Sequence, residues 1–220
     1  MRCDMTAYYP INLKLEDRPC VVIGGGNVAL RKVRSLLACG GRVKVISPEL
    51  CPGLRSLAGE GEVQWLRRGY RAGDLEGAFL VIAATDDEEM NARVASEAKE
   101  RGVLLNVVDD PERCGFIVPA TVQRGDLVIT VSTSGKSPML ARKIREELER
   151  RFGPEYGPYV DFLGRVRELV VRDVPAERRP AVFREIVYDR DDLFGLVEAG
   201  DEERALAEVR ELIDRVVSVG

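Results

Sequence analysis

Three polar residues stand at the ends of apolar segments in this chain, where a folded protein could hold a reacting group. Thr85 follows one strongly apolar segment, and Asn106 and Asp109 stand within and just after the next one. If both segments are strands of a parallel sheet, their carboxyl ends meet at one edge and bring the three side chains together, where we expect Thr85 and Asn106 to contact a bound cofactor. A carboxylate at that edge can accept a proton from a bound molecule, so Asp109 is a candidate general base beside a cofactor.

The same residues also have an ordinary structural interpretation. The sequence Asp109-Asp110-Pro111 readily forms turns, and Thr85 or one of the two aspartates after it is suited to begin a helix as its N-cap. The residue types alone do not decide between the two interpretations. The chain of 220 residues contains no histidine, so the commonest general base and the commonest metal ligand are both missing. That absence makes one of the two aspartates, Asp109 or Asp110, the first candidate for acid–base chemistry.

A glycine turn earlier in the chain indicates what kind of molecule would bind at this edge. The apolar segment Val21–Ile23 runs directly into Gly24, Gly26 and Ala29, which form the pattern G-x-G-x-x-A, and a helix is predicted from Val28. The first glycine allows a tight turn, the second leaves room for a pyrophosphate, and the alanine lets the helix pack close to the strand. The helix N-terminus adds free N–H groups for the phosphates. A dinucleotide site is the favoured interpretation, and a purely structural turn is the alternative.

The residues after the second predicted strand bear on which dinucleotide binds. Such folds usually place a carboxylate at this strand tip, about 20 residues after the glycines, to bind the ribose hydroxyls. Here Ser47 occupies the tip, so its hydroxyl or nearby backbone groups are the candidates for the ribose. No arginine stands at the tip to receive a 2′-phosphate, which favours NAD over NADP.

The elements that would position these residues follow an α/β pattern over the first half of the chain. Apolar strands alternate with predicted helices, and several strands are apolar throughout, as expected for a parallel sheet covered on both faces. We therefore predict a doubly wound, Rossmann-type domain over residues 1–113. Its strands are expected at residues 21–23, 43–46, 63–66, 79–84 and 104–108, after a short strand or lead-in at residues 11–15.

The rest of the chain has a different character. Helical periodicity dominates its second part, after a polar turn at Arg124-Gly125-Asp126. We expect a small β-containing element over residues 114–150 and a helical C-terminal domain over residues 151–220. Short strands are predicted at residues 116–119, 121–123 and 127–132, and helices at 139–152, from 158, from near 180, and at 201–217.

A hydroxyl-rich loop precedes the helix predicted from residue 139. Ser134 and Ser137 present hydroxyl groups there, and Lys136 and Arg142 add positive charge, which suits the binding of an anion at a helix N-terminus. The alternative is a capped helix with a solvated charged face, and the residues by themselves favour it.

Composition limits the other classes of function. Lysine and arginine number 33 against 37 aspartate and glutamate residues, and the net charge of −4 argues against a general nucleic-acid binder. The five cysteines form no C-x-x-C pair, so we expect no metal site or disulfide framework, but reduced thiols in a cytoplasmic protein. No apolar run approaches the roughly 18 residues of a membrane span, and no signal peptide is recognised before the first predicted strand.

Six segments, taken together and in order, resemble the precorrin-2 dehydrogenase family of siroheme biosynthesis, some of whose members are also sirohydrochlorin ferrochelatases. The resemblance covers the first 150 residues, and the helical tail is similar in length and character only. The segments are Tyr9–Leu13, Val21–Lys32, Ala83–Asp87, Asn106–Asp109, Phe116–Ala120 and Val131–Arg142.

The resemblance implies a homodimeric enzyme that oxidises precorrin-2 to sirohydrochlorin with NAD⁺, and that could also insert Fe²⁺ or Co²⁺ into the product. It implies that Asp109 is the important acidic residue and that the segment after the Rossmann domain mediates dimerisation. Contacts to NAD are implied for Asn27 and Val28 in the glycine turn, and for Pro48 and Glu49 after the second strand.

The tetrapyrrole substrate carries many carboxylates, so cationic anchors are expected despite the negative net charge. We assign this role to Lys136 and Arg142, with Ser134 and Ser137 beside them. The alternative function, of a different class, is a non-catalytic NAD(H)-sensing regulatory module whose tail helices bind a partner. The hydroxyl-rich loop and the segment Asn106–Asp109 argue against a sensor, which needs neither.

Overall fold

The computed structural model describes residues 8–218, and the contacts divide the chain after Val118 into two compact units, each described by itself. Cys3 lies outside the described residues. The four cysteines within them are free thiols: Cys20, Cys39, Cys51 and Cys114.

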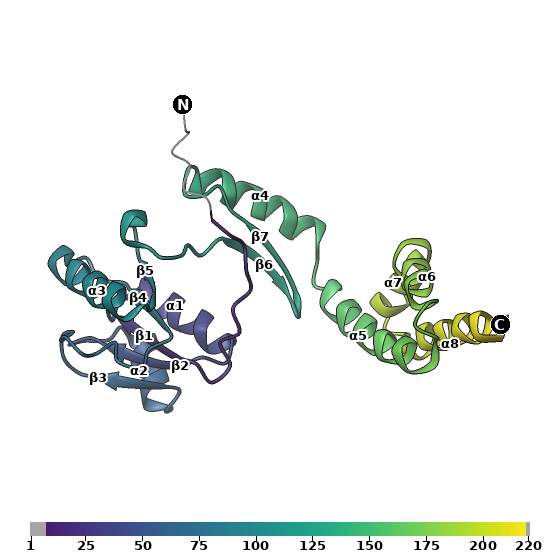
Figure 1. The fold of residues 1–220 in the computed structure, drawn as a ribbon, viewed down its shortest axis with the longest axis horizontal. Helices are drawn as coiled ribbons and strands as arrows, with labels where there is room; N and C mark the ends of the chain where they lie inside the picture. The colour runs from purple at the N-terminus through teal and green to yellow at the C-terminus, as the bar shows by residue number, and fades with distance from the viewer. Residues whose placement is uncertain (1–7, 219–220) are drawn as a thin grey trace. The chain divides into compact units, whose positions relative to one another are not determined.

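The first unit is built on a parallel sheet of five strands in the order β3-β2-β1-β4-β5 (Figure 1). The strand order reverses between β1 and β4, which is the point at which such sheets bind ligands outside the carboxyl ends of their strands. The Rossmann-type prediction is confirmed, and the segment before β1 is a lead-in without a strand. The strands are β1 (Pro19–Ile23), β2 (Arg42–Ile46), β3 (Val63–Leu66), β4 (Leu80–Ala83) and β5 (Leu104–Val107).

Helices cover both faces of this sheet, because side chains alternate from one face to the other along each strand. Val22 is fully buried against a layer that contains α1 (Asn27–Ala38) and α2 (Pro52–Gly59). Its neighbour Val21 is buried in the opposite layer, which contains α3 (Glu88–Arg101). Burial on both faces explains why the strands are apolar throughout.

The outer edge of β5 is closed by the chain that follows it. The N–H of Gly115 donates to the carbonyl of Leu105 at 2.8 Å. The sulfur of Cys114 accepts from the N–H of Val107 at 3.2 Å and lies 3.2 Å from the carbonyl of the same residue, within reach of its S–H. This thiol therefore takes the place that a neighbouring strand would occupy.

The strand predicted at residues 116–119 is absent. The carbonyl of Phe116 accepts a hydrogen bond from Nδ2 of Asn106 at 3.1 Å, and Pro119 has no N–H to give to a ladder. The prediction was therefore wrong for this segment, because a side chain of β5 binds its backbone.

The second unit begins with an antiparallel hairpin of β6 (Ala120–Arg124) and β7 (Leu127–Val131). Helix α4 (Pro138–Arg151) contacts both strands of this hairpin (Figure 1). The remaining helices of the unit share one core, in which Phe162 and Leu193 are fully buried. One eight-residue helix, α7 (Asp191–Glu198), was not predicted as a separate element, because its apolar pattern is too short to be distinguished from those of the neighbouring helices. These helices are α5 (Tyr156–Asp173), α6 (Arg179–Arg184), α7 (Asp191–Glu198) and α8 (Glu202–Ser218), with a π-helical turn at Glu185–Asp189.

A buried carboxylate ties the connection between β3 and β4 to α3. Glu97 is only 8% exposed and accepts hydrogen bonds from the N–H groups of Gly73 at 3.0 Å and Leu75 at 3.3 Å, from Nε of Arg101 at 2.8 Å, and from the hydroxyl of Tyr70. Burial by itself would raise the pKa of this carboxyl group, but these hydrogen bonds outweigh it and lower the pKa below its ordinary value.

Replacement of Glu97 by alanine is expected to destabilise the first unit by about 3 kcal/mol, because it leaves buried donors without an acceptor. The contribution of Glu97 is present above its unfolded pKa of about 4.3 and is lost as the pH falls through the lower folded value. Denaturation followed by the fluorescence of Trp65, the single tryptophan, reports on this unit. Glu100→Ala, at an exposed position of the same helix, is the matched control and should cost less than about 0.5 kcal/mol. Equal losses in both variants would contradict the assignment.

Candidate functional site

A cavity of about 510 Å³ lies within the first unit, at the carboxyl ends of β4 and β5 and beside the start of α1. It brings together five of the predicted site residues. The other predicted residues of this unit, at positions 24, 47–49 and 106, do not line it. The five are Gly26, Asn27, Val28, Thr85 and Asp109.

The glycine turn has three positions with different requirements. Gly24 has φ 118°, and a Cβ there would lie 2.1 Å from the carbonyl oxygen of Ala84. A Cβ on Gly25 would lie 1.8 Å from the carbonyl oxygen of Glu49, a constraint that the G-x-G-x-x-A pattern does not contain. Gly26 has no atom within 4 Å of a Cβ position, so the space in front of it is open. The turn therefore needs two glycines for its own packing and leaves the third free to face a ligand.

The start of α1 fits a pyrophosphate. Gly26 provides no side-chain cap, and the first turn contains no acidic residue, so the first N–H groups face the cavity without an internal anion. The start of α3 is the opposite case, because Asp87 accepts from the N–H of Met90 at 2.9 Å and two glutamates follow it. An anion in this cavity is therefore favoured at α1 and not at α3.

The two aspartates after β5 have separate roles. Asp110 accepts from the N–H of Arg113 at 3.3 Å and pairs with its guanidinium, so it begins the short 3₁₀ turn Pro111–Arg113. Asp109 is exposed, has φ 61°, and has no hydrogen bond or ion pair with any of the described residues. Aspartate tolerates this left-handed conformation better than most residues. Turn chemistry thus accounts for Asp110 and leaves the carboxylate of Asp109 available.

Two family models match consecutive parts of this chain. The family model described as "Putative NAD(P)-binding" matches residues 11–120, and that described as "Sirohaem biosynthesis protein central" matches residues 124–151. The chain belongs to this NAD(P)-binding family.

Individual relatives agree with this membership. The siroheme synthase of Chromobacterium violaceum is 43% identical over 209 residues, which cover 94% of this chain and 44% of that protein. Siroheme synthase 1 of Serratia proteamaculans is 45% identical over 174 residues, which cover 78% of this chain and 37% of that protein. The chain thus spans less than half the length of these relatives. The solved structure of SirC, a precorrin-2 dehydrogenase, has a TM-score of 0.77 at 25% identity, covering 93% of this chain and all of that one.

In this NAD(P)-binding domain, the polar groups at the tip of β2 are hydrogen-bonded within the chain. Ser47 is buried, its hydroxyl donates to the carbonyl of Glu49 at 2.6 Å, and its own carbonyl accepts from Nε1 of Trp65 at 2.9 Å. The hydroxyl proton is therefore engaged, and the predicted contacts of Ser47, Pro48 and Glu49 to a ribose stay predictions.

Asn106 and Thr85 make hydrogen bonds to the chain segments that follow β5 and β4, which line the cavity. Asn106 is buried and donates from Nδ2 to the carbonyl of Phe116 and, at 3.5 Å, to the sulfur of Cys114. Thr85 accepts at Oγ1 from the N–H of Asp87 at 3.3 Å, so the N-cap of α3 is Asp87 and Thr85 supports it. Their predicted contacts to the cofactor stay predictions.

The charge around the cavity is mainly negative. Its lining carries the carboxylates of Asp86, Glu88, Asp109 and Asp110 against one guanidinium, which Asp110 already binds. The charge of Asp109 acts on the ammonium group of Lys32 in α1. The pKa of Lys32 is lowered, mainly by burial, and the negative charge of Asp109 partly opposes this shift. Cationic anchors for a polycarboxylate are therefore not supplied by this lining.

The hydroxyl-rich loop belongs to the second unit and is organised as a helix cap. Oγ of Ser137 accepts from the N–H of Leu140 at 3.3 Å, and Arg142 pairs with Glu146 at 2.8 Å on the exposed face of α4. Ser134 and Lys136 are exposed. These contacts agree with the capped-helix interpretation, and the substrate-binding role of the four residues stays a prediction.

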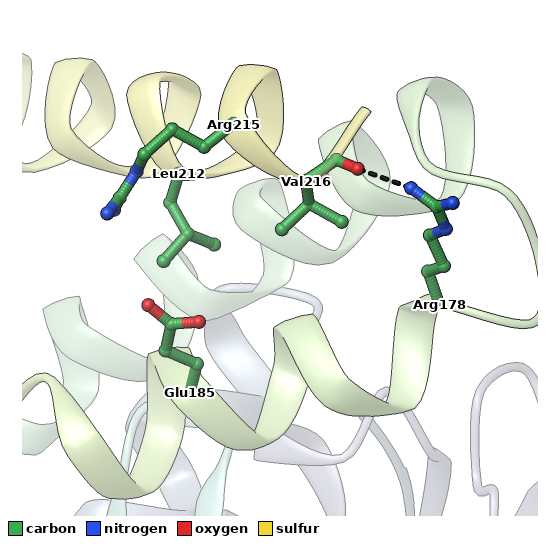
Figure 2. Close-up of a pocket in the computed structure, with 5 residues that line it drawn as sticks. All are labelled: Arg178, Glu185, Leu212, Arg215 and Val216. Carbon is green, nitrogen blue, oxygen red and sulfur yellow. Dashed lines mark hydrogen bonds between the residues drawn. The ribbon is translucent and has the colours of Figure 1, made fainter. Parts of the chain in front are cut away.

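A second cavity, of about 360 Å³, lies among the C-terminal helices and contains none of the predicted site residues (Figure 2). Nη1 of Arg178 donates to the carbonyl of Val216 at 2.6 Å, so it satisfies a carbonyl near the end of α8. Glu185 lies below Leu212 and Arg215 in the same view. Capping explains the arginine without a ligand.

Residues 8–218 contain no helix that is long and apolar enough to cross a membrane. Within the same range, no three side chains of histidine, cysteine, aspartate or glutamate come together as a metal site requires.

Proposed function

We propose that this chain catalyses the NAD⁺-dependent oxidation of precorrin-2 to sirohydrochlorin. The observation that carries the proposal is the shared cavity, in which the unpaired carboxylate of Asp109 and the open start of α1 at Gly26 both take part. The likeness to SirC, which spans the whole of that protein, supports the proposal. The sequence identity of 43% and 45% between this chain and two siroheme synthases supports the proposal as well.

The reaction removes one hydride and one proton from the substrate. The N-terminus of α1 at Gly26 would hold the pyrophosphate of NAD⁺, which would supply the hydride acceptor when bound. The carboxylate of Asp109 accepts the proton and, being exposed, releases it to solvent. The products are then sirohydrochlorin, NADH and one proton. The lack of an arginine at the β2 tip favours NAD over NADP.

The substrate carboxylates need cations that the acidic cavity does not provide. We assign them to Lys136 and Arg142, with the hydroxyls of Ser134 and Ser137 beside them. Arg142 would exchange Glu146 for a substrate carboxylate, and an exposed pair of this kind costs little to open.

The organisation of the protein extends this proposal. We assign NAD binding to residues 1–113, dimerisation and substrate contact to residues 114–150, and a helical domain to residues 151–220. The match of residues 124–151 to the central family of siroheme biosynthesis supports a distinct role for the middle segment. The free thiols support a cytoplasmic location.

An anaerobic assay with purified protein, precorrin-2 and NAD⁺ tests the function. We expect the absorbance of NADH to rise in proportion to the substrate consumed. Binding of NAD(H) without any NADH formation, under conditions where a known dehydrogenase works, would favour the NAD-sensing alternative. Addition of Fe²⁺ or Co²⁺ to the sirohydrochlorin formed by the same sample then measures metal insertion.

A further inference from the structure

Asn91, in the first turn of α3, carries a buried polar atom without a partner. The residue is 6% exposed, and its Nδ2 donates to the carbonyl of Thr85 at 3.0 Å. Its Oδ1 has no hydrogen-bond partner among the described residues. The same residue lines the cavity that contains Gly26 and Asp109.

The hydrogen bond to Thr85 accounts for Nδ2 of this asparagine but not for its Oδ1. Asn91 shares its helix face with Val94 and Ala98, which are buried in the apolar layer against the sheet. A buried acceptor without a donor costs about 1–3 kcal/mol. Buried polar atoms are normally hydrogen-bonded, so this oxygen is expected to accept from a donor outside the chain.

The topology indicates which part of a dinucleotide brings this donor. The pyrophosphate is expected at the start of α1, after β1, and the adenosine ribose near the tip of β2. Asn91 follows β4, on the other side of the point where the strand order reverses. That side belongs to the second nucleoside of the cofactor, which in NAD carries the nicotinamide.

We propose that Oδ1 of Asn91 accepts a hydrogen bond from the nicotinamide riboside half of the cofactor, either from the carboxamide N–H or from a ribose hydroxyl. The inference rests on the proposed binding of NAD⁺. Because the oxygen is enclosed, the contact requires a small displacement of the loop at Thr85, which the same asparagine holds through Nδ2. Asn91 would thus contact the bound cofactor through Oδ1 and position the loop at Thr85 through Nδ2.

The test compares the affinity of the full chain and of Asn91→Leu for four ligands by calorimetry. The ligands are NAD⁺, its 3-acetylpyridine analogue without a carboxamide N–H, ADP-ribose and ADP. For Asn91→Leu we expect the Kd for NAD⁺ to rise about 10-fold, and the Kd for ADP to stay unchanged. Loss of affinity for ADP-ribose as well would identify the ribose as the donor. Equal affinity of the variant for NAD⁺ and its analogue, which the native chain distinguishes, would identify the carboxamide.

Two results would overturn the inference. An equal loss for all four ligands, ADP included, would mean that the leucine only disturbs the loop. An unchanged Kd for NAD⁺ would mean that the oxygen needs no ligand, as when a buried water satisfies it. Both differ from failure of the proposed function, in which the native chain itself binds no NAD⁺. Unfolding followed at Trp65 checks that the variant is folded.

Discussion

Asparagine in place of Asp109 is expected to lower the rate of NADH formation from precorrin-2 by about 1,000-fold and to leave the Kd for NAD⁺ unchanged. The estimate follows from the loss of a general base, which is worth about 10²–10⁴ in rate. Asparagine has the same size and tolerates the same left-handed backbone, so φ 61° at this position is not disturbed. Single-turnover measurements and calorimetry separate the two quantities.

Asp17 offers a matched control for this experiment. It is also an exposed aspartate with a positive φ, of 57°, but it precedes β1, at the opposite end of the sheet from the cavity. Asp17→Asn should keep full activity. If Asp109→Asn lost NAD⁺ affinity together with activity, or kept its rate, Asp109 would be a structural residue of the loop.

Alanine at two glycines of the turn is expected to have opposite effects. Gly24→Ala should destabilise the first unit by roughly 3 kcal/mol or more, because a Cβ would lie 2.1 Å from a backbone oxygen at φ 118°. Gly26→Ala should change stability by no more than about 1 kcal/mol, since its Cβ meets no atom and its φ is −84°. It should nevertheless weaken NAD⁺ binding by about 10- to 100-fold, because the methyl group occupies the place of the pyrophosphate.

The pair is informative because each variant serves as the control of the other. Denaturation followed at Trp65 gives the stability of the unit, and calorimetry gives the affinity. A stable Gly26→Ala with unchanged NAD⁺ affinity would place the cofactor elsewhere. A stable Gly24→Ala would show that the turn can move away from β4.

Much of the first unit could be predicted because its signals are local. The glycines at 24 and 26 stand between an apolar strand and an amphipathic helix, and the strands are apolar because both faces of the sheet are covered. The pair Asp109 and Asp110 became candidates from their place after β5, and the family resemblance favoured Asp109, whose catalytic role stays a prediction. The difference between the two residues could not be predicted from the residues alone, because the roles of two adjacent aspartates depend on which one reaches Arg113.

The residues that escaped prediction depend on contacts distant in sequence. Gly25 is required by the carbonyl of Glu49, and the absent strand at residues 116–119 is explained by the side chain of Asn106. Asn91 did leave a signal, since it stands at i, i+3 and i+7 with Val94 and Ala98 on an apolar helix stripe. A polar residue on such a stripe is a candidate for a binding role, and a search for apolar periodicity alone does not select it.

The closed edge of β5 matters for the solubility of the chain as well as for its chemistry. An open edge strand offers free N–H and carbonyl groups to other chains, which is a common route to aggregation. Cys114 and Gly115 occupy those groups, and the same segment anchors the loop that carries Asp109. Burial raises the pKa of the Cys114 thiol, which keeps it protonated and slow to react. Oxidation of this one sulfur would release the loop that carries Asp109 and expose the edge of β5 together, so any loss of activity through this loop would coincide with self-association.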